Sequence, residues 1–114
     1  MAFTTGPIEN QGNLPANATN VRVKVLNRTA GALNGVIRVF RLNGTRTQIA
    51  ASLFNANANS STFVTLNLTS NTFEYEVVIE PNQNGGLFSV YGRTASNVII
   101  TAQRVLHSEL TQIT

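Results

Sequence analysis

Cysteine, aspartate and tryptophan are absent from this chain of 114 residues. Without cysteine there can be no disulfide and no thiolate metal ligand. A single histidine, His107, and five glutamates remain as the side chains most often used to bind metals or to transfer protons. Zinc and calcium sites need several such ligands close together. The composition therefore predicts a protein that is not an enzyme and that has no metal site and no cofactor.

Charge is scarce as well, because only 11% of the residues are charged, against about 25% in an average soluble domain. The opening residues, MAFTTGPIENQ, contain no basic patch followed by an apolar run, so they do not resemble a Sec-type signal. No apolar run approaches the length of about 20 residues that a membrane-spanning helix needs. We therefore expect a chain made in the cytoplasm without a Sec-type signal, and no membrane span.

Residues 1–19 differ in composition from the rest of the chain. They contain two of the three prolines, Pro7 and Pro15, and they show no hydrophobic periodicity. Proline at these positions blocks a central strand or a helix. Three apolar residues, Phe3, Ile8 and Leu14, are spaced along this arm. We divide the chain into an N-terminal arm or connector, 1–19, and one domain, 20–114. The arm is either a disordered tail or a segment that docks on another copy of the protein.

From residue 20 onward apolar and polar residues alternate, which is typical of β-strands. The turn Asn43-Gly44 is a strong hairpin signal. In TRTQIAASLF the alternation predicts that Ile49, Ala51 and Leu53 share one face. Seven or eight short antiparallel strands predict an all-β fold, a single β-sandwich of jelly-roll or Ig-like type. The segments are VRVKVLN, GVIRVFRL, TRTQIAASLF, STFVTLNL, TFEYEVVIEP, LFSVYGR and VIITAQRVL, with ELTQI as a candidate eighth.

Three of the five carboxylates, Glu74, Glu76 and Glu80, fall on one face of TFEYEVVIEP. Alternate residues of a strand lie about 7 Å apart, a spacing that could serve acid–base chemistry on sugars. That chemistry needs a cleft, whereas the apolar residues occupy the opposite, inward face. The glutamates are therefore expected outside. Arg22 and Lys24 have the same outward parity in VRVKV, so the two charged rows could pair within a sheet or between subunits.

The sequence does not favour a hydrolase or a nucleic-acid-binding protein. A hydrolase would depend on Glu76 or His107, but a lone histidine with no aspartate or cysteine does not complete a usual triad, and His107 is expected at the surface. Arg38, Arg41 and Arg46 gather around one hairpin. The aromatic residues form no obvious stacking platform beside them, so no nucleic-acid partner is expected.

The phrases VRVKVLN, TFEYEVVIEP, LFSVYGRTASN and AQRVLHSELTQI resemble those of small β-rich surface proteins of endospore-forming bacteria, in particular the subunits of endospore appendage fibres. The resemblance covers about residues 20 to 113. It implies a jelly-roll subunit, made in the mother cell, whose N-terminal connector inserts into a neighbour to build a fibre. On that basis Phe3, Ile8 and Leu14 would be connector residues. Well-known subunits of this type carry cysteines that cross-link the fibre, and this chain has none.

The sequence thus predicts a structural subunit that self-assembles into an extracellular or spore-surface fibre through its arm and its open sheet edges. Its partners would be other copies of itself and other spore-surface proteins. The alternative is a surface- or carbohydrate-binding module that uses the loops NRTAGALNG and PNQNGG. The candidate subunit-contact residues are Phe3, Ile8, Leu14, Arg22, Lys24, Glu74, Glu76 and Glu80.

Overall fold

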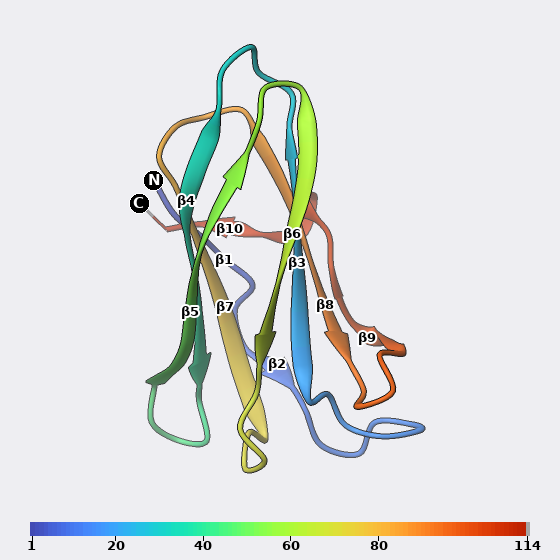
Figure 1. The fold of residues 1–114 in the computed structure, drawn as a ribbon. Helices are drawn as coiled ribbons and strands as arrows, with labels where there is room; N and C mark the ends of the chain where they lie inside the picture. Colours follow the sequence, from blue (N-terminus) through green and yellow to red (C-terminus); the bar gives the residue numbers. More distant parts are fainter. Residues whose placement is uncertain (114) are drawn as a thin grey trace.

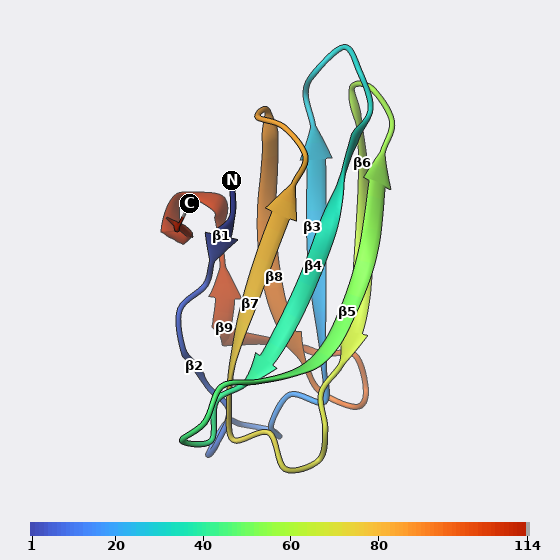
Figure 2. The same cartoon turned by 90° about the vertical axis from the view of Figure 1, so that its left-hand side faces the viewer.

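The computed structural model describes residues 1–113, which form two antiparallel β-sheets packed face to face (Figures 1 and 2). This confirms the predicted all-β sandwich. The predicted domain ends at Thr114, which lies outside the described residues. The strands are β1 (Phe3–Thr4), β2 (Ile8–Glu9), β3 (Asn20–Asn27), β4 (Leu33–Arg41), β5 (Thr47–Ala56), β6 (Ser60–Asn67), β7 (Glu74–Pro81), β8 (Gly86–Arg93), β9 (Ile99–Val105) and β10 (Thr111–Gln112), with a short 3-10 helix, η1 (His107–Glu109), before β10.

Each sheet combines strands that lie far apart in the sequence. Sheet A runs β10-β1-β7-β4-β5, with β2 also paired to β7, and sheet B runs β6-β3-β8-β9. The first two long strands of the chain, β3 and β4, belong to different sheets and do not pair with each other. The seven predicted segments correspond to β3 through β9, and ELTQI contains β10. The two short strands of the arm, β1 and β2, bring the total to ten instead of seven or eight.

The core lies between the sheets and is built from alternate residues of the long strands. Burying each aliphatic side chain stabilises the fold by about 1.5–3 kcal/mol. The apolar rows of β3 and β7 that were predicted to face inward do so, except that Phe73 precedes β7 and is half exposed. The most completely buried core residues include Val21, Val23 and Val25 of β3, Ile37 and Val39 of β4, and Tyr75, Val77 and Ile79 of β7.

Strand β5 departs from the predicted pattern. The pairing of β4 with β5 shifts between Val39 and Phe40, so that Ile49 is an extra residue opposite no partner. A bulge of this kind reverses the side-chain parity beyond it. Ile49 packs against the core, but Ala51 is exposed and Leu53 is 77% exposed. The prediction that these three residues share one face is therefore wrong.

A buried chain of polar side chains crosses the end of the sandwich. The Tyr75 hydroxyl donates to Gln103 Oε1 at 2.6 Å, and Gln103 Nε2 donates to Asn10 Oδ1 at 2.9 Å. Asn10 in turn donates through Nδ2 to the carbonyl oxygens of Ala18 and Thr72. Burial raises the pKa of the Tyr75 phenol well above its ordinary value of 10.0. The arm, β7 and β9 are joined by this chain.

Candidate functional site: the arm and the sheet borders

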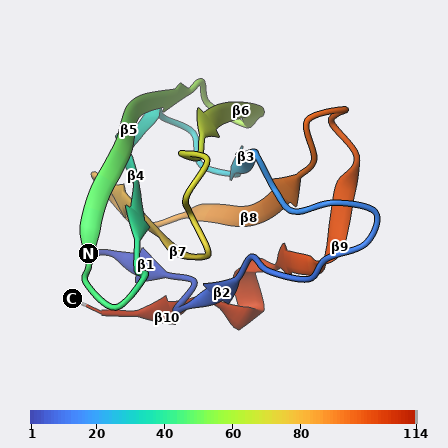
Figure 3. The same ribbon diagram turned by 90° about the horizontal axis from the view of Figure 1, so that it is seen from below.

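The N-terminal arm forms one border of sheet A on its own chain. Strand β1 lies between β7 and β10, with Phe3 opposite Ile79, and β2 continues along the same edge of β7. Between them the Thr5 N–H donates to the Val77 carbonyl at 3.0 Å. The arm is therefore ordered in this structure. Figure 3 shows β1, β2 and β10 on the side of the sandwich opposite β5 and β6.

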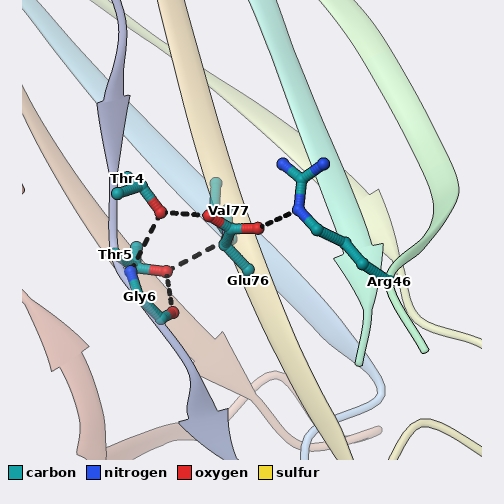
Figure 4. A network of polar contacts seen from close by, with 6 residues as sticks. All are labelled: Thr4, Thr5, Gly6, Arg46, Glu76 and Val77. Atoms are coloured by element: carbon teal, nitrogen blue, oxygen red, sulfur yellow. Dashed lines mark hydrogen bonds and ion pairs between the residues drawn. The ribbon is translucent and has the colours of Figure 1, made fainter. Parts of the chain in front are cut away.

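Glu76 joins the arm to the other side of β7 (Figure 4). One carboxylate oxygen accepts a hydrogen bond from the Thr4 hydroxyl, and the other pairs with Arg46 Nε at 2.8 Å. The Arg46 guanidinium also stacks 3.6 Å above the Phe40 ring. The Glu76 side chain is only 14% exposed. Glu76 thus anchors the arm within one chain. Sequence reasoning missed this role, because Thr4 lies 72 positions away from Glu76 and no local pattern links the two.

The three predicted connector residues have different surroundings. Phe3 is half-buried, with its ring centroid 5.9 Å from Phe88 and 5.4 Å from His107. Ile8 is buried in the core. Leu14 is 89% exposed in the segment 11–17, which joins the arm to the domain. The structure therefore brings Phe3 and Ile8 onto the sandwich and leaves Leu14 outside it.

The acidic row lies on the outer face of sheet A, as predicted, but its partners are different from those expected. Glu80 pairs with Arg38 at 3.0 Å and Glu76 with Arg46. Glu74 is paired across the strands with Glu9 of β2, a like-charged neighbour. Two of the three glutamates are thus partnered within the chain, and two of the three clustered arginines, Arg38 and Arg46, are their partners.

The predicted basic pair lies on the other sheet. Arg22 and Lys24 project from β3 on the outer face of sheet B, so they cannot pair with the glutamates of β7 within one sheet. That option is wrong, because β3 and β7 are in opposite layers. Arg22 and Lys24 instead lie over the ring of Phe63 in β6, at 4.1 and 5.6 Å from its centroid. The pairing between subunits stays a prediction.

The border formed by β5 and β6 is open. Strand β5 pairs only with β4 and β6 only with β3 among the described strands. A turn at 57–59 joins them, and they lie side by side in Figures 2 and 3. Neither strand contains a charged residue or a proline. Beside Leu53 and Phe54, a hollow of about 490 Å³ continues onto Gly35 and Val36 of β4.

The single histidine is held in the structure instead of lying free at the surface. His107 is half-buried, and its Nδ1 accepts the Phe88 N–H at 3.1 Å. Glu109 accepts the Leu106 N–H at 2.8 Å. Within residues 1–113 no group of three potential metal ligands comes together. No helix in that range is long and apolar enough to cross a membrane.

The two loops of the alternative binding function lie together at one end of the sandwich. Gln83 Nε2 donates to the Ala32 carbonyl at 2.9 Å, and Asn82 Oδ1 accepts the Asn34 N–H at 3.0 Å. Neither loop contains an aromatic residue. The structure therefore brings these loops together but offers no ring on which a sugar could stack, and the binding function stays a prediction.

Comparison with known proteins yields no match to any family model, to any curated protein or to any solved structure. The class of protein rests on the fold alone, which is an antiparallel β-sandwich with its N-terminal arm in one sheet. The resemblance to endospore appendage subunits stays a prediction.

Proposed function

We propose that this chain is a structural subunit that self-assembles into a fibre through its open sheet borders and its arm. The observation that carries the proposal is the uncharged, unpaired border of β5 and β6. Natural sheets usually protect such edges with lysine, proline or very short strands. A β-bulge can also protect an edge, and the bulge at Ile49 is the only one of these features found in β5 and β6. An edge left in this state favours addition of a strand from another molecule.

The opposite side of sheet B offers a second border. Strand β9 pairs with β8 at only three registered positions, and its other side has no partner strand in residues 1–113. Contact between β6 of one copy and β9 of the next would continue sheet B from subunit to subunit. Such a head-to-tail contact joins two different edges, so every added subunit still has a free β6 or β9 edge. The contact can therefore repeat into a ring or an open filament.

The arm provides a second contact that would reinforce the one made at the open border. The connector at 11–17 forms no strand and is largely exposed. Seven extended residues span about 24 Å, which is comparable to the 28 and 22 Å of the two shorter dimensions of the molecule. An arm released from its own β7 can therefore reach β7 of an adjacent copy and form the same pairs there. The spore-surface or extracellular location belongs to the same proposal and is supported only by the resemblance.

The experiment compares the wild-type protein with Leu53→Lys by sedimentation velocity and negative-stain electron microscopy. We expect filaments or stacked rings from the wild type and monomers from Leu53→Lys, because a charge at the open border must be desolvated on pairing. Leu53 is 77% exposed, so the substitution leaves the core intact. Asn84→Lys adds the same charge to an exposed turn and should assemble like the wild type. Assembly by a folded Leu53→Lys variant would remove this border from the mechanism.

A further inference from the structure

The outer face of sheet B contains a cationic hollow of about 420 Å³. Alternation along β3 and β8 places Arg22, Lys24, Tyr91 and Arg93 on this one face, and Arg22 is registered directly opposite Tyr91. The turn that follows β8 contributes Asn97 at one end. The lining residues are Arg22, Lys24, Tyr91, Arg93, Asn97 and Ile99.

The three cations of this hollow have no carboxylate partner. The ion pairs found among residues 1–113 both lie on sheet A, where they join Arg38 to Glu80 and Arg46 to Glu76. The hollow therefore collects positive charge that the rest of the described chain does not neutralise. The pKa of Arg93 is lowered, first by burial and second by the positive charge of Arg22. An anion bound between the two guanidinium groups would offset the second cause, the repulsion between Arg22 and Arg93.

Two of the three cations are already oriented. Arg93 is only 9% exposed, and its Nε donates to Asn20 Oδ1 at 2.8 Å. No buried side-chain nitrogen or oxygen in the described residues lacks a partner. The terminal nitrogens of Arg93, which make no further hydrogen bond there, therefore reach solvent. Arg22 is held by Thr65 at 3.3 Å and by its stacking over Phe63. Fixed guanidinium groups lose little entropy when they bind an anion.

We propose that this hollow binds a phosphate or sulfate group between Arg22, Lys24 and Arg93. A tetrahedral oxyanion presents several acceptor oxygens in different directions, which suits donors that approach from two strands. A nucleic acid would need faces on which bases stack, and the ring of Phe63 is already covered by Arg22 and Lys24. The acidic row of a second copy fits less well, because Glu76 and Glu80 are engaged within their own chain and, in the described residues, only Glu74 of that row is left without an ion pair. This inference does not depend on the proposed assembly.

Equilibrium dialysis with radiolabelled sulfate tests the site in monomers and in assembled protein alike. Sodium chloride keeps the ionic strength constant. We expect saturable binding of one sulfate per chain, and an affinity about tenfold weaker in Lys24→Gln, because that variant loses one charge-assisted hydrogen bond. Lys24 is exposed, so its replacement does not endanger folding. Arg93→Gln should weaken binding at least as much.

The matched control is Arg41→Gln, which removes the same charge from sheet A and should bind sulfate like the wild type. Equal affinity in Lys24→Gln and the wild type, or no saturable binding above the chloride background, overturns the proposal. Dextran sulfate, with neutral dextran beside it, separates two sources of the group. Displacement of labelled sulfate by dextran sulfate, but not by neutral dextran, shows that the site takes a polymer-borne group. Sulfate binding that survives dextran sulfate shows that it takes the free anion.

Discussion

Tyr75 is the residue at which burial and protonation are most directly coupled. Its phenol is fully buried and donates to Gln103, and burial raises its pKa well above the ordinary 10.0. The folded state therefore holds the phenol proton more tightly than the unfolded chain does. The corresponding stability is fully present below about pH 10 and is lost as the pH rises toward the folded pKa, because the unfolded state then binds fewer protons.

We expect the free energy of unfolding of the wild type to fall as the pH rises above about 10, and Tyr75→Phe to flatten that fall. At neutral pH the same variant should be less stable by about 1–3 kcal/mol, because Gln103 Oε1 loses its buried donor. Urea unfolding at a series of pH values measures both effects. Tyr91→Phe removes a partly exposed tyrosine and should keep the alkaline slope. An unchanged slope in Tyr75→Phe would contradict the assignment.

Gly92 is required by the same polar chain. A Cβ at this position would clash with the Tyr75 hydroxyl and with Gln103, because it would lie less than 3.0 Å from each. We expect Gly92→Ala to destabilise the fold by about 1–3 kcal/mol through overpacking, measured as a lower urea midpoint. Gly31→Ala is the control, since a Cβ there meets nothing within 4 Å, and it should change stability by less than about 0.5 kcal/mol. Equal urea midpoints for the two variants would contradict this prediction, because they would show that the side chains around Gly92 rearrange to accept a methyl group.

At the scale of strands, the sequence predicts most of the fold. Alternation identifies β3 through β9, and the turn at Asn43-Gly44 joins β4 and β5 as expected. The parity of β5 is missed because one bulged residue, Ile49, reverses it and leaves no mark in the composition. The strands β1 and β2 are missed because two residues cannot show a period.

The candidate site is predicted less completely than the fold. The outward parity of Glu76 and Arg22 follows from alternation, but their partners do not. Thr4 meets Glu76 across 72 positions, and Gln103 meets Asn10 across 93. Such contacts depend on sheet order, which a single sequence does not encode in any local pattern. The connector residues Phe3 and Leu14 look alike in sequence, but in the structure Phe3 lies beside Phe88 and Leu14 is exposed.

Exchange of the arm between subunits can be tested with an introduced pair of cysteines. The chain contains no cysteine of its own, so only that pair can form a disulfide. Glu9 and Glu74 are registered opposite each other on β2 and β7. Paired Cα atoms lie about 4.5–5.5 Å apart, within the range that a disulfide bridges. We expect Glu9→Cys/Glu74→Cys to give a covalent ladder when assembled protein is oxidised, and a cross-linked single chain when dilute monomer is oxidised. Non-reducing gel electrophoresis separates these products.

The control for that experiment is Lys24→Cys/Ser89→Cys, which joins β3 to β8 inside sheet B. Both strands have partners on both sides, so this pair should close only within one chain in either sample. A single cross-linked chain from assembled Glu9→Cys/Glu74→Cys would show that the arm stays on its own β7. The open border of β5 and β6 would then be the remaining route of assembly.

At the scale of the whole molecule, the two sides of the sandwich are unequal. On one side the arm and β10 continue sheet A, and β9 ends sheet B with only three registered pairs to β8. The other consists of β5 and β6, whose outward edges meet no partner strand in the described chain. Low charge and an outer surface rich in asparagine and threonine reduce the cost of packing copies together. The asymmetry gives the molecule a direction, which a head-to-tail filament requires.

Hydrogen exchange of the backbone amides in β5 and β6 is the most direct test of this account, followed by mass spectrometry as the protein concentration is raised. Amides with no partner exchange rapidly, and pairing with another chain protects them. We expect protection in Thr47–Ala56 and Ser60–Asn67 to rise with assembly, while the central strands β3 and β7 stay protected throughout. A monomer at every concentration, with exchange in β5 and β6 unchanged, would contradict the proposal that this border joins subunits.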